Sequence, residues 1–212
     1  MGSVGTVECP SCSAPVERVA GVRTVSCPYC GTAIVSEEHR KEFQAEEILE
    51  KTKISYGPRD RGPLGIDTAG FYNNQGFVIK GVIEYRDSDG WTWQEYFLKF
   101  NDGRVGWLEY DDGDYFLNFE IDEEFKKGMF GIKIGNDKMK VKEKGTSIIN
   151  YQHGHLPFSY PPDTQIKYID GRSTKDPRKR YSVEYTDNEV EVYEGAKVRV
   201  EKSENHIDIL RM

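Results

Sequence analysis

The sequence of 212 residues lacks the features of a membrane-spanning or secreted protein. No apolar run approaches the ~20 residues that a membrane-spanning helix needs. The chain has no apolar signal segment, so we expect an intracellular, cytoplasmic protein. Peripheral association with a membrane stays open. Positive charge is not in excess either, because the formal net charge is −7, and this predicts no general affinity for nucleic acid.

Recognisable catalytic motifs are also missing. The sequence has no G-x-S-x-G nucleophile elbow and no glycine-rich phosphate loop. Glu95 or Glu109 could do acid–base chemistry with a histidine, but so could any pair of carboxylates. Since the four cysteines are assigned to a metal below, no thiol is left to act as a nucleophile. We therefore predict a protein that is not an enzyme.

Cysteine is scarce and confined to the first 30 residues, where it forms two C-x2-C pairs. The predicted ligands of one structural Zn²⁺ are Cys9, Cys12, Cys27 and Cys30. This spacing is typical of a tetrahedral site built from two knuckles, and four thiolates leave no open position for catalysis. Disulfides would need an oxidising compartment, and a redox C-x-x-C normally occurs once, so both alternatives are weaker.

The chain divides into three predicted parts. Residues 1–35 form a small zinc ribbon, and residues 36–66 form a connecting helix and a linker. Residues 67–212 contain short segments of alternating apolar and polar residues, separated by Asp-, Asn- and Gly-rich turns every 8–12 residues. This pattern predicts an antiparallel all-β domain, either a sandwich or a partly open barrel.

An internal similarity indicates that the β-domain contains two related β-units. Residues 99–104 followed by 108–113 resemble residues 167–172 followed by 183–188. Both copies read as a strand, a D-G-R turn, and a second strand that ends in Glu-Tyr. If the similarity reflects a structural repeat, the two units pack their inner faces into one core.

Aromatic residues are frequent in the first half of this domain. They are Trp91, Trp93, Tyr96, Trp107 and Tyr110. At alternating positions of strands, such residues could form a binding face, but they more often fill the core of a sheet. We expect these aromatic residues to fill the core.

Several motifs resemble a known bacterial family. Residues 91–98 read W-T-W-Q-E-Y-F-L and are followed by D-G at 102–103 and G-W-L at 106–108. Later segments are H-L-P-F at 155–158, S-V-E-Y at 182–185 and E-V-Y-E-G at 191–195. With these motifs, residues 60–200 resemble the domain-of-unknown-function family numbered 4178, from which the basic insertion at 172–180 departs.

The resemblance implies an all-β domain without known catalytic residues, which a zinc ribbon precedes in such proteins. Their genes lie near those for phage-shock-like membrane-remodelling proteins, small membrane proteins and polyamine-synthesis enzymes. This association implies an accessory role in envelope stress or membrane maintenance. We therefore expect a non-enzymatic adaptor or scaffold that binds protein partners through the ribbon and the β-domain.

Two alternatives remain from other functional classes. The first is a nucleic-acid-binding zinc-ribbon protein, in which a basic loop contacts phosphates. The candidate phosphate-binding residues of this loop are Arg172, Lys175, Arg178, Lys179 and Arg180. The second is a sensor of a small ligand, either a polyamine or an anion, and the acidic net charge makes polyamines the first ligands to test.

Overall fold

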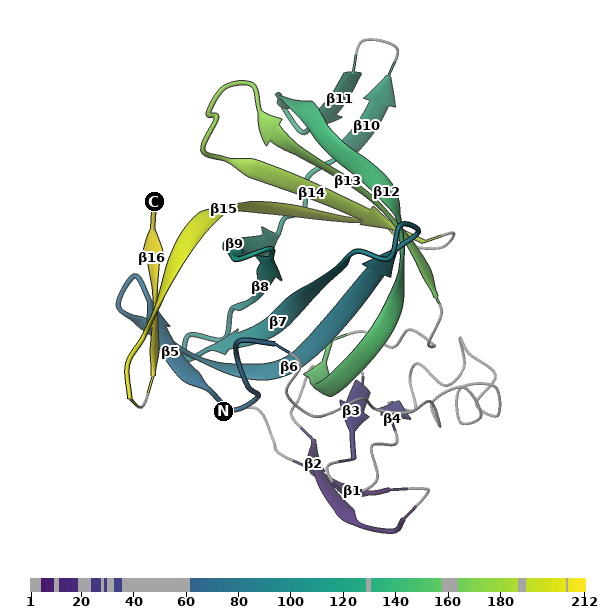
Figure 1. Ribbon diagram of the computed structural model, residues 1–212, viewed down its shortest axis with the longest axis vertical. Helices are drawn as coiled ribbons and strands as arrows, with labels where there is room; N and C mark the ends of the chain where they lie inside the picture. The colour runs from purple at the N-terminus through teal and green to yellow at the C-terminus, as the bar shows by residue number, and fades with distance from the viewer. Residues whose placement is uncertain are drawn as a thin grey trace.

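The computed structural model describes residues 5–9, 12–18, 24–27, 29, 33–35, 62–128, 131–157, 164–186, 190–204 and 206–212. Within these ranges the protein is all-β and contains no helix, which confirms the predicted fold class (Figure 1). Among them, no helical segment has the length and apolar character of a membrane span. The predicted connecting helix and Cys30 lie outside the described residues.

Eight strands form a closed antiparallel barrel (Figure 1). The first meander comprises β6 (Gln75–Asp87), β7 (Thr92–Phe100), β8 (Val105–Asp111) and β9 (Asp114–Glu120). The second comprises β12 (Asp137–Leu156), β13 (Gln165–Ser173), β14 (Arg180–Tyr185) and β15 (Val190–Lys202). Antiparallel pairing of β6 with β12 and of β9 with β15 joins the meanders at both sides. The sheet therefore closes on itself and leaves these eight strands with no unpaired barrel edge.

The two meanders correspond only partly to the internal similarity of the sequence. The D-G-R sequence at 102–104 forms the turn between β7 and β8, where Gly103 has a positive φ of 91°. The one at 170–172 lies inside β13, so the prediction of a second D-G-R turn is wrong. The reason is packing: a Cβ on Gly171 would lie 2.5 Å from Met139 Cγ of the neighbouring strand β12, and glycine permits this close approach.

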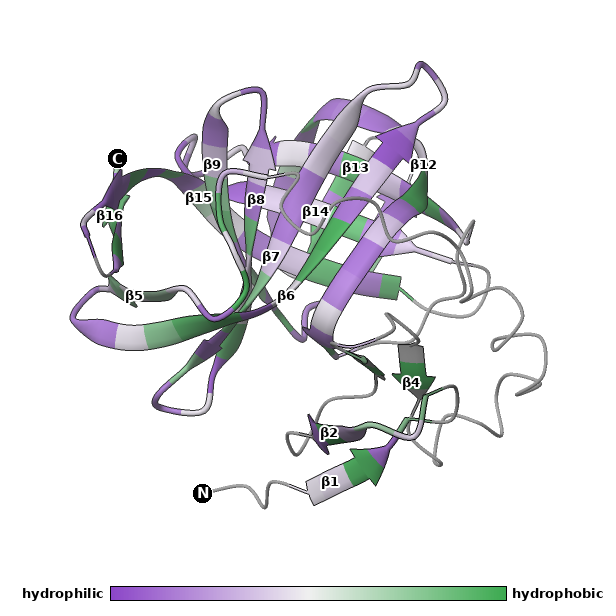
Figure 2. Ribbon diagram, turned by 60° about the horizontal axis from the view of Figure 1, so that its bottom comes forward, coloured by the Kyte–Doolittle hydropathy of each residue, from purple (hydrophilic) through white to green (hydrophobic). Residues whose placement is uncertain are grey.

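Successive side chains of β7 point to opposite faces of the sheet and enter two different hydrophobic cores. Tyr96 and Leu98 point outward into a cluster that also contains Phe77 and Ile209, whereas Phe97 points into the barrel. The outer cluster is covered by β5 (Ala69–Tyr72) and β16 (Ile207–Arg211), which pair with β6 and β15 and, in parallel, with each other. Apolar residues run along β6, green in Figure 2. Leu64, which the sequence assigns to the linker, packs into this outer core.

Inside the barrel, apolar side chains fill one end. This cluster includes Ile83, Phe97, Trp107, Leu156 and Tyr193. Trp107 is only 6% exposed, so here the expected core role of the aromatic residues is confirmed. A hairpin of β10 (Phe125–Gly128) and β11 (Gly131–Ile134) extends the sheet beyond β12.

The N-terminal module lies against this apolar end. It contains the hairpin of β1 (Gly5–Glu8) and β2 (Pro15–Arg18) and that of β3 (Thr24–Ser26) and β4 (Ala33–Val35). Strand β3 pairs with the last residues of β12, Val25 opposite His155 and Thr24 opposite Leu156. The His155 ring also donates a hydrogen bond of 2.7 Å from Nε2 to the backbone carbonyl of Glu17. The module is therefore attached to the barrel wall through β12.

Candidate functional site: an acidic cavity inside the barrel

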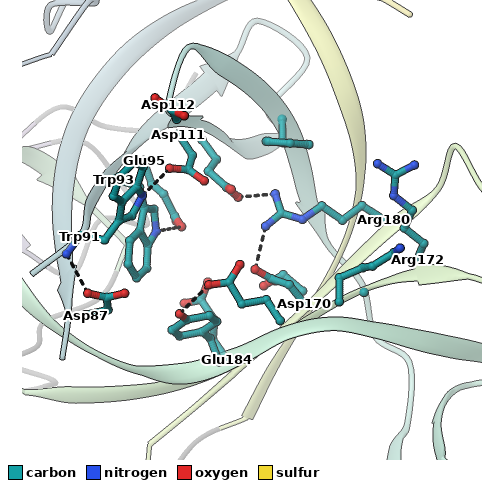
Figure 3. Close-up of a pocket in the computed structure, with 17 residues that line it drawn as sticks. Asp87, Trp91, Trp93, Glu95, Asp111, Asp112, Asp170, Arg172, Arg180 and Glu184 are labelled. Atoms are coloured by element: carbon teal, nitrogen blue, oxygen red, sulfur yellow. Dashed lines mark hydrogen bonds and ion pairs between the residues drawn. The ribbon is translucent and has the colours of Figure 1, made fainter. Parts of the chain in front are cut away.

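The polar end of the barrel encloses a cavity of about 460 Å³ (Figure 3). Its inner part is formed by Glu95 on β7, Glu109 on β8, Asp170 on β13, and Arg180 and Glu184 on β14. The two-residue period of a strand brings these side chains to the inner face, while their sequence neighbours face outward. Segments from both meanders therefore contribute to one site.

Acidic residues dominate the lining of the cavity. Eight carboxylates line it: Asp87, Glu95, Glu109, Asp111, Asp112, Glu143, Asp170 and Glu184. Three basic residues line it: Lys142, Arg172 and Arg180. Carboxylates thus exceed basic groups by five, and a concave site of this kind concentrates cations from solution.

Arg180 is the basic residue that reaches the inner carboxylates. Its Nη1 lies 2.5 Å from Glu109 Oε2, and its Nη2 lies 2.8 Å from Asp170 Oδ2. The guanidinium carbon lies 4.5 Å from the centre of the Phe116 ring. Burial opposes the charge of Arg180, but the two carboxylates outweigh this effect and raise its pKa above the ordinary value. Arg180 is therefore fully engaged by Glu109 and Asp170.

Within the described ranges, Glu95 and Glu184 have no such basic partner. Among the described residues neither forms an ion pair, and no hydrogen bond reaches the Glu184 carboxylate. Glu95 is 8% exposed and accepts a hydrogen bond of 3.3 Å from Trp93 Nε1. Burial, and next the charge of Glu109, raises the pKa of Glu95 to about 8. Burial and the charge of Glu95 likewise raise the pKa of Glu184 well above its ordinary range.

Aromatic rings form one wall of the cavity. Trp93 stacks on Tyr85 with 5.4 Å between ring centres and contacts Tyr168 edge-to-face at 5.5 Å. Trp91 is half exposed and donates a hydrogen bond of 2.8 Å from its indole nitrogen to Asp111. The expectation that these tryptophans fill the core is therefore wrong for Trp91, which is 51% exposed. Trp93 is partly buried and packs against the inner hydrophobic cluster, as expected, and it also lines the cavity.

The predicted basic loop, between β13 and β14, is largely engaged in internal contacts. Arg178 pairs with Asp176 at 3.2 Å, and Lys179 pairs with Glu194 at 2.7 Å. Arg180 points into the barrel, as described above. The other two donate to backbone carbonyls: Lys175 to Asn136 at 2.8 Å and Arg172 to Pro177 at 3.4 Å. Phosphate binding by this loop stays a prediction. Its internal contacts leave fewer basic side chains available for phosphate than the sequence suggests.

Three cysteines of the N-terminal module come together as predicted. The sulfur atoms of Cys9, Cys12 and Cys27 all lie within 4.8 Å of one another, and those of Cys12 and Cys27 are 3.6 Å apart. Cys9 and Cys27 are buried with Val16, Val25 and Ile34. This cluster could hold a metal ion.

A family model for a domain of unknown function, DUF4178, matches residues 65–200, well over half of the chain. The chain belongs to the DUF4178 family. The match spans all eight barrel strands to within two residues of the end of β15, so every residue of the cavity lies inside the DUF4178 domain. No curated protein and no solved structure matches the chain.

Proposed function

We propose that the DUF4178 barrel binds a small organic cation of the amine class in its acidic cavity. The proposal rests on one observation: Glu95 and Glu184 face the cavity without a basic partner among the described residues. Burying an ionised carboxylate without a counter-charge is costly. An ammonium group between these two residues would supply the missing charge.

The remaining groups of the cavity suit the same ligand. A carboxylate accepts hydrogen bonds only, and an ammonium group only donates them. Asp170, which lines the cavity, adds a buried acceptor, because its Oδ1 has no hydrogen-bond partner in the described part of the chain. Trp93 adds an aromatic face, and such faces attract cations by about 0.5–2 kcal/mol.

The size of the cavity fits a small molecule. Ligand sites usually enclose about 300–1,000 Å³, and this cavity measures about 460 Å³. Linear polyamines, which combine several ammonium groups with apolar spacers, match both the acidic and the aromatic surfaces. Of the two sensor ligands expected from the sequence, the charge of the cavity therefore favours the polyamine over the anion.

The adaptor role expected from the sequence is compatible with this proposal. The cysteine module would contact a protein partner, and its exposed Tyr29 offers an aromatic side chain for such a contact. The barrel would then bind the amine, and the cysteine module would bind the protein partner.

Zinc with Cys30 as the fourth ligand is the metal centre that we propose for the N-terminal module. With Zn–S bonds of about 2.3 Å, two sulfurs of a tetrahedron lie about 3.8 Å apart. The observed 3.6 Å between Cys12 and Cys27 fits this geometry. Cys30 completes the second C-x2-C pair, three residues after Cys27.

Thermal unfolding in the presence of candidate ligands tests the amine proposal. Spermidine and putrescine should raise the melting temperature by about 5–10 °C at a hundredfold excess over Kd, whereas glutamate and citrate should not. Glu184→Gln should reduce the shift markedly, because it removes one of the two carboxyl groups. Glu120→Gln, at an exposed carboxylate of β9, is the matched control and should retain it. Equal shifts in both variants, or none in the unmodified protein, would refute binding in the cavity.

A further inference from the structure

We infer that the Glu95–Glu184 pair holds a proton in the ligand-free barrel and exchanges it for the ammonium group of the ligand. The inference rests on the proposed function and adds to it the protonation of this pair before a ligand binds. Figure 3 shows the two carboxyl groups directed into the same part of the cavity, from β7 and β14.

The surrounding charges explain why a proton is needed. The charged groups that act on Glu95, Glu184 or both are Glu109 on β8, Asp170 on β13, Arg180 on β14 and Glu191 on β15. Those nearer the mouth are Asp87, Asp111, Asp112, Lys142, Glu143 and Arg172. Arg180 contacts Glu109 and Asp170, which leaves Glu95 and Glu184 to be neutralised in another way.

Two carboxylates in one buried site do not both ionise readily. Desolvation penalises each charge, and the first charge to form disfavours the second. A proton on the pair removes one negative charge. Both effects act here. Glu95 is buried and Glu184 is half-buried. The charge of Glu109 acts on both groups, and the charge of Glu95 acts on Glu184.

Exchange conserves atoms and charge. A carboxylic acid of the pair plus a protonated amine gives a carboxylate–ammonium ion pair plus a proton released to solvent. The O–H bond of the acid breaks, and the ammonium N–H groups donate hydrogen bonds to the oxygens left behind. Each ammonium group that pairs with the acid therefore releases up to one proton and leaves the net charge at this pair unchanged. The further ammonium groups of a polyamine add their positive charge to the other carboxylates of the cavity.

The exchange makes affinity depend on pH in a defined direction. At low pH the pair is protonated and the ligand must displace protons, so binding is weak. Release of one proton per ligand makes binding roughly tenfold tighter per pH unit. This gain should fade as pH approaches about 8, the pKa of Glu95.

Two measurements on the full-length protein test the inference. Calorimetric titration with spermidine at pH 7, in phosphate and in Tris buffer, counts the protons released, because the observed enthalpy changes with the ionisation enthalpy of the buffer. We expect about one proton per ligand for the unmodified protein and for Glu120→Gln. Glu95→Gln or Glu184→Gln should release markedly less. In the ligand-free protein, the ¹³C NMR titration of the glutamate carboxyls should show a group that titrates near pH 8 and disappears in Glu95→Gln.

The outcomes separate the two proposals. Binding without proton release would overturn the exchange and leave amine binding intact. Ordinary carboxyl titration of both residues in the ligand-free protein would overturn the exchange whether or not a ligand binds. Failure of every amine to bind would overturn both, even if a raised titration midpoint were observed. If one glutamine variant does not fold, the other still decides the proton count.

Discussion

The Arg180 guanidinium lies 2.5 Å from the Glu109 carboxylate, although 71 positions of sequence separate the two residues. Glu109 belongs to the first meander and Arg180 to the second, so this ion pair connects the two halves across the barrel interior. Glu109 and Asp170 thereby hold the cation of Arg180. In the proposed function, Glu95 and Glu184 are the groups that an amine ligand neutralises.

Replacing Arg180 with methionine should strongly destabilise the barrel. The change leaves Glu109 and Asp170 without their basic partner, and breaking a buried ion pair in this way typically costs about 3–5 kcal/mol. Urea unfolding followed by tryptophan fluorescence measures the loss. Arg178→Met, at an exposed arginine that pairs with Asp176, should leave the midpoint unchanged. Similar midpoints for the two variants would show that the buried pair has no structural role.

The stability of the ligand-free protein should fall as pH rises from about 4.5 to about 8. Because the folded state raises the pKa of Glu95 from 4.5 to about 8, it binds more protons than the unfolded state within this window. Stability contributed by the protonated group is lost as the folded state is forced to ionise, by at most about 1.4 kcal/mol per pH unit for one group. Unfolding midpoints across this range measure the slope. Glu95→Gln should flatten it, and an unchanged slope in that variant would contradict the assignment.

Metal removal should unfold the cysteine module while the barrel stays folded. All three tryptophans of the chain, Trp91, Trp93 and Trp107, belong to the barrel, so tryptophan fluorescence reports on the barrel alone. We expect a chelator or Cys9→Ser to expose the module to proteases without changing the fluorescence transition. Elemental analysis should find one zinc per chain, and Cys30→Ser should lower this content. Loss of the fluorescence transition on chelation would mean that module and barrel share one cooperative unit.

Gly171→Ala should destabilise the second meander. A Cβ at this position meets Met139 Cγ at 2.5 Å and the Lys140 carbonyl oxygen at 2.6 Å, and overpacking of this kind costs about 1–3 kcal/mol. Gly128→Ala is the control, because its Cβ would meet only one atom, at 3.8 Å. Denaturant unfolding of both variants checks the difference. A neutral Gly171→Ala would indicate that β12 and β13 can separate at this point.

Local alternation explains why the strands could be predicted from the sequence. Along residues 92–100 the period of two separates Phe97 in the barrel from Tyr96 and Leu98 in the outer core, as the pattern requires. Closure of the barrel could not be predicted in this way. It depends on the pairing of β6 with β12 and of β9 with β15, and the local pattern of a strand does not specify its distant neighbour.

The cavity was missed for a related reason. Carboxylates on the polar face of a strand look solvent-exposed until the sheet is known to close around them. One signal was present: both copies of the internal similarity end a strand with Glu-Tyr, at Glu109-Tyr110 and Glu184-Tyr185. The structure brings these two glutamates to the same cavity. The three-cysteine cluster, in contrast, follows directly from the C-x2-C spacing.

A crystal structure of the protein grown with spermidine tests the central claim most directly. The account predicts ligand density inside the barrel, with an ammonium nitrogen within hydrogen-bond distance of both Glu95 and Glu184 and the chain passing over the Trp93 ring. Density confined to the outer surface, or an empty cavity at saturating spermidine, would contradict the claim that this barrel is an amine-binding site.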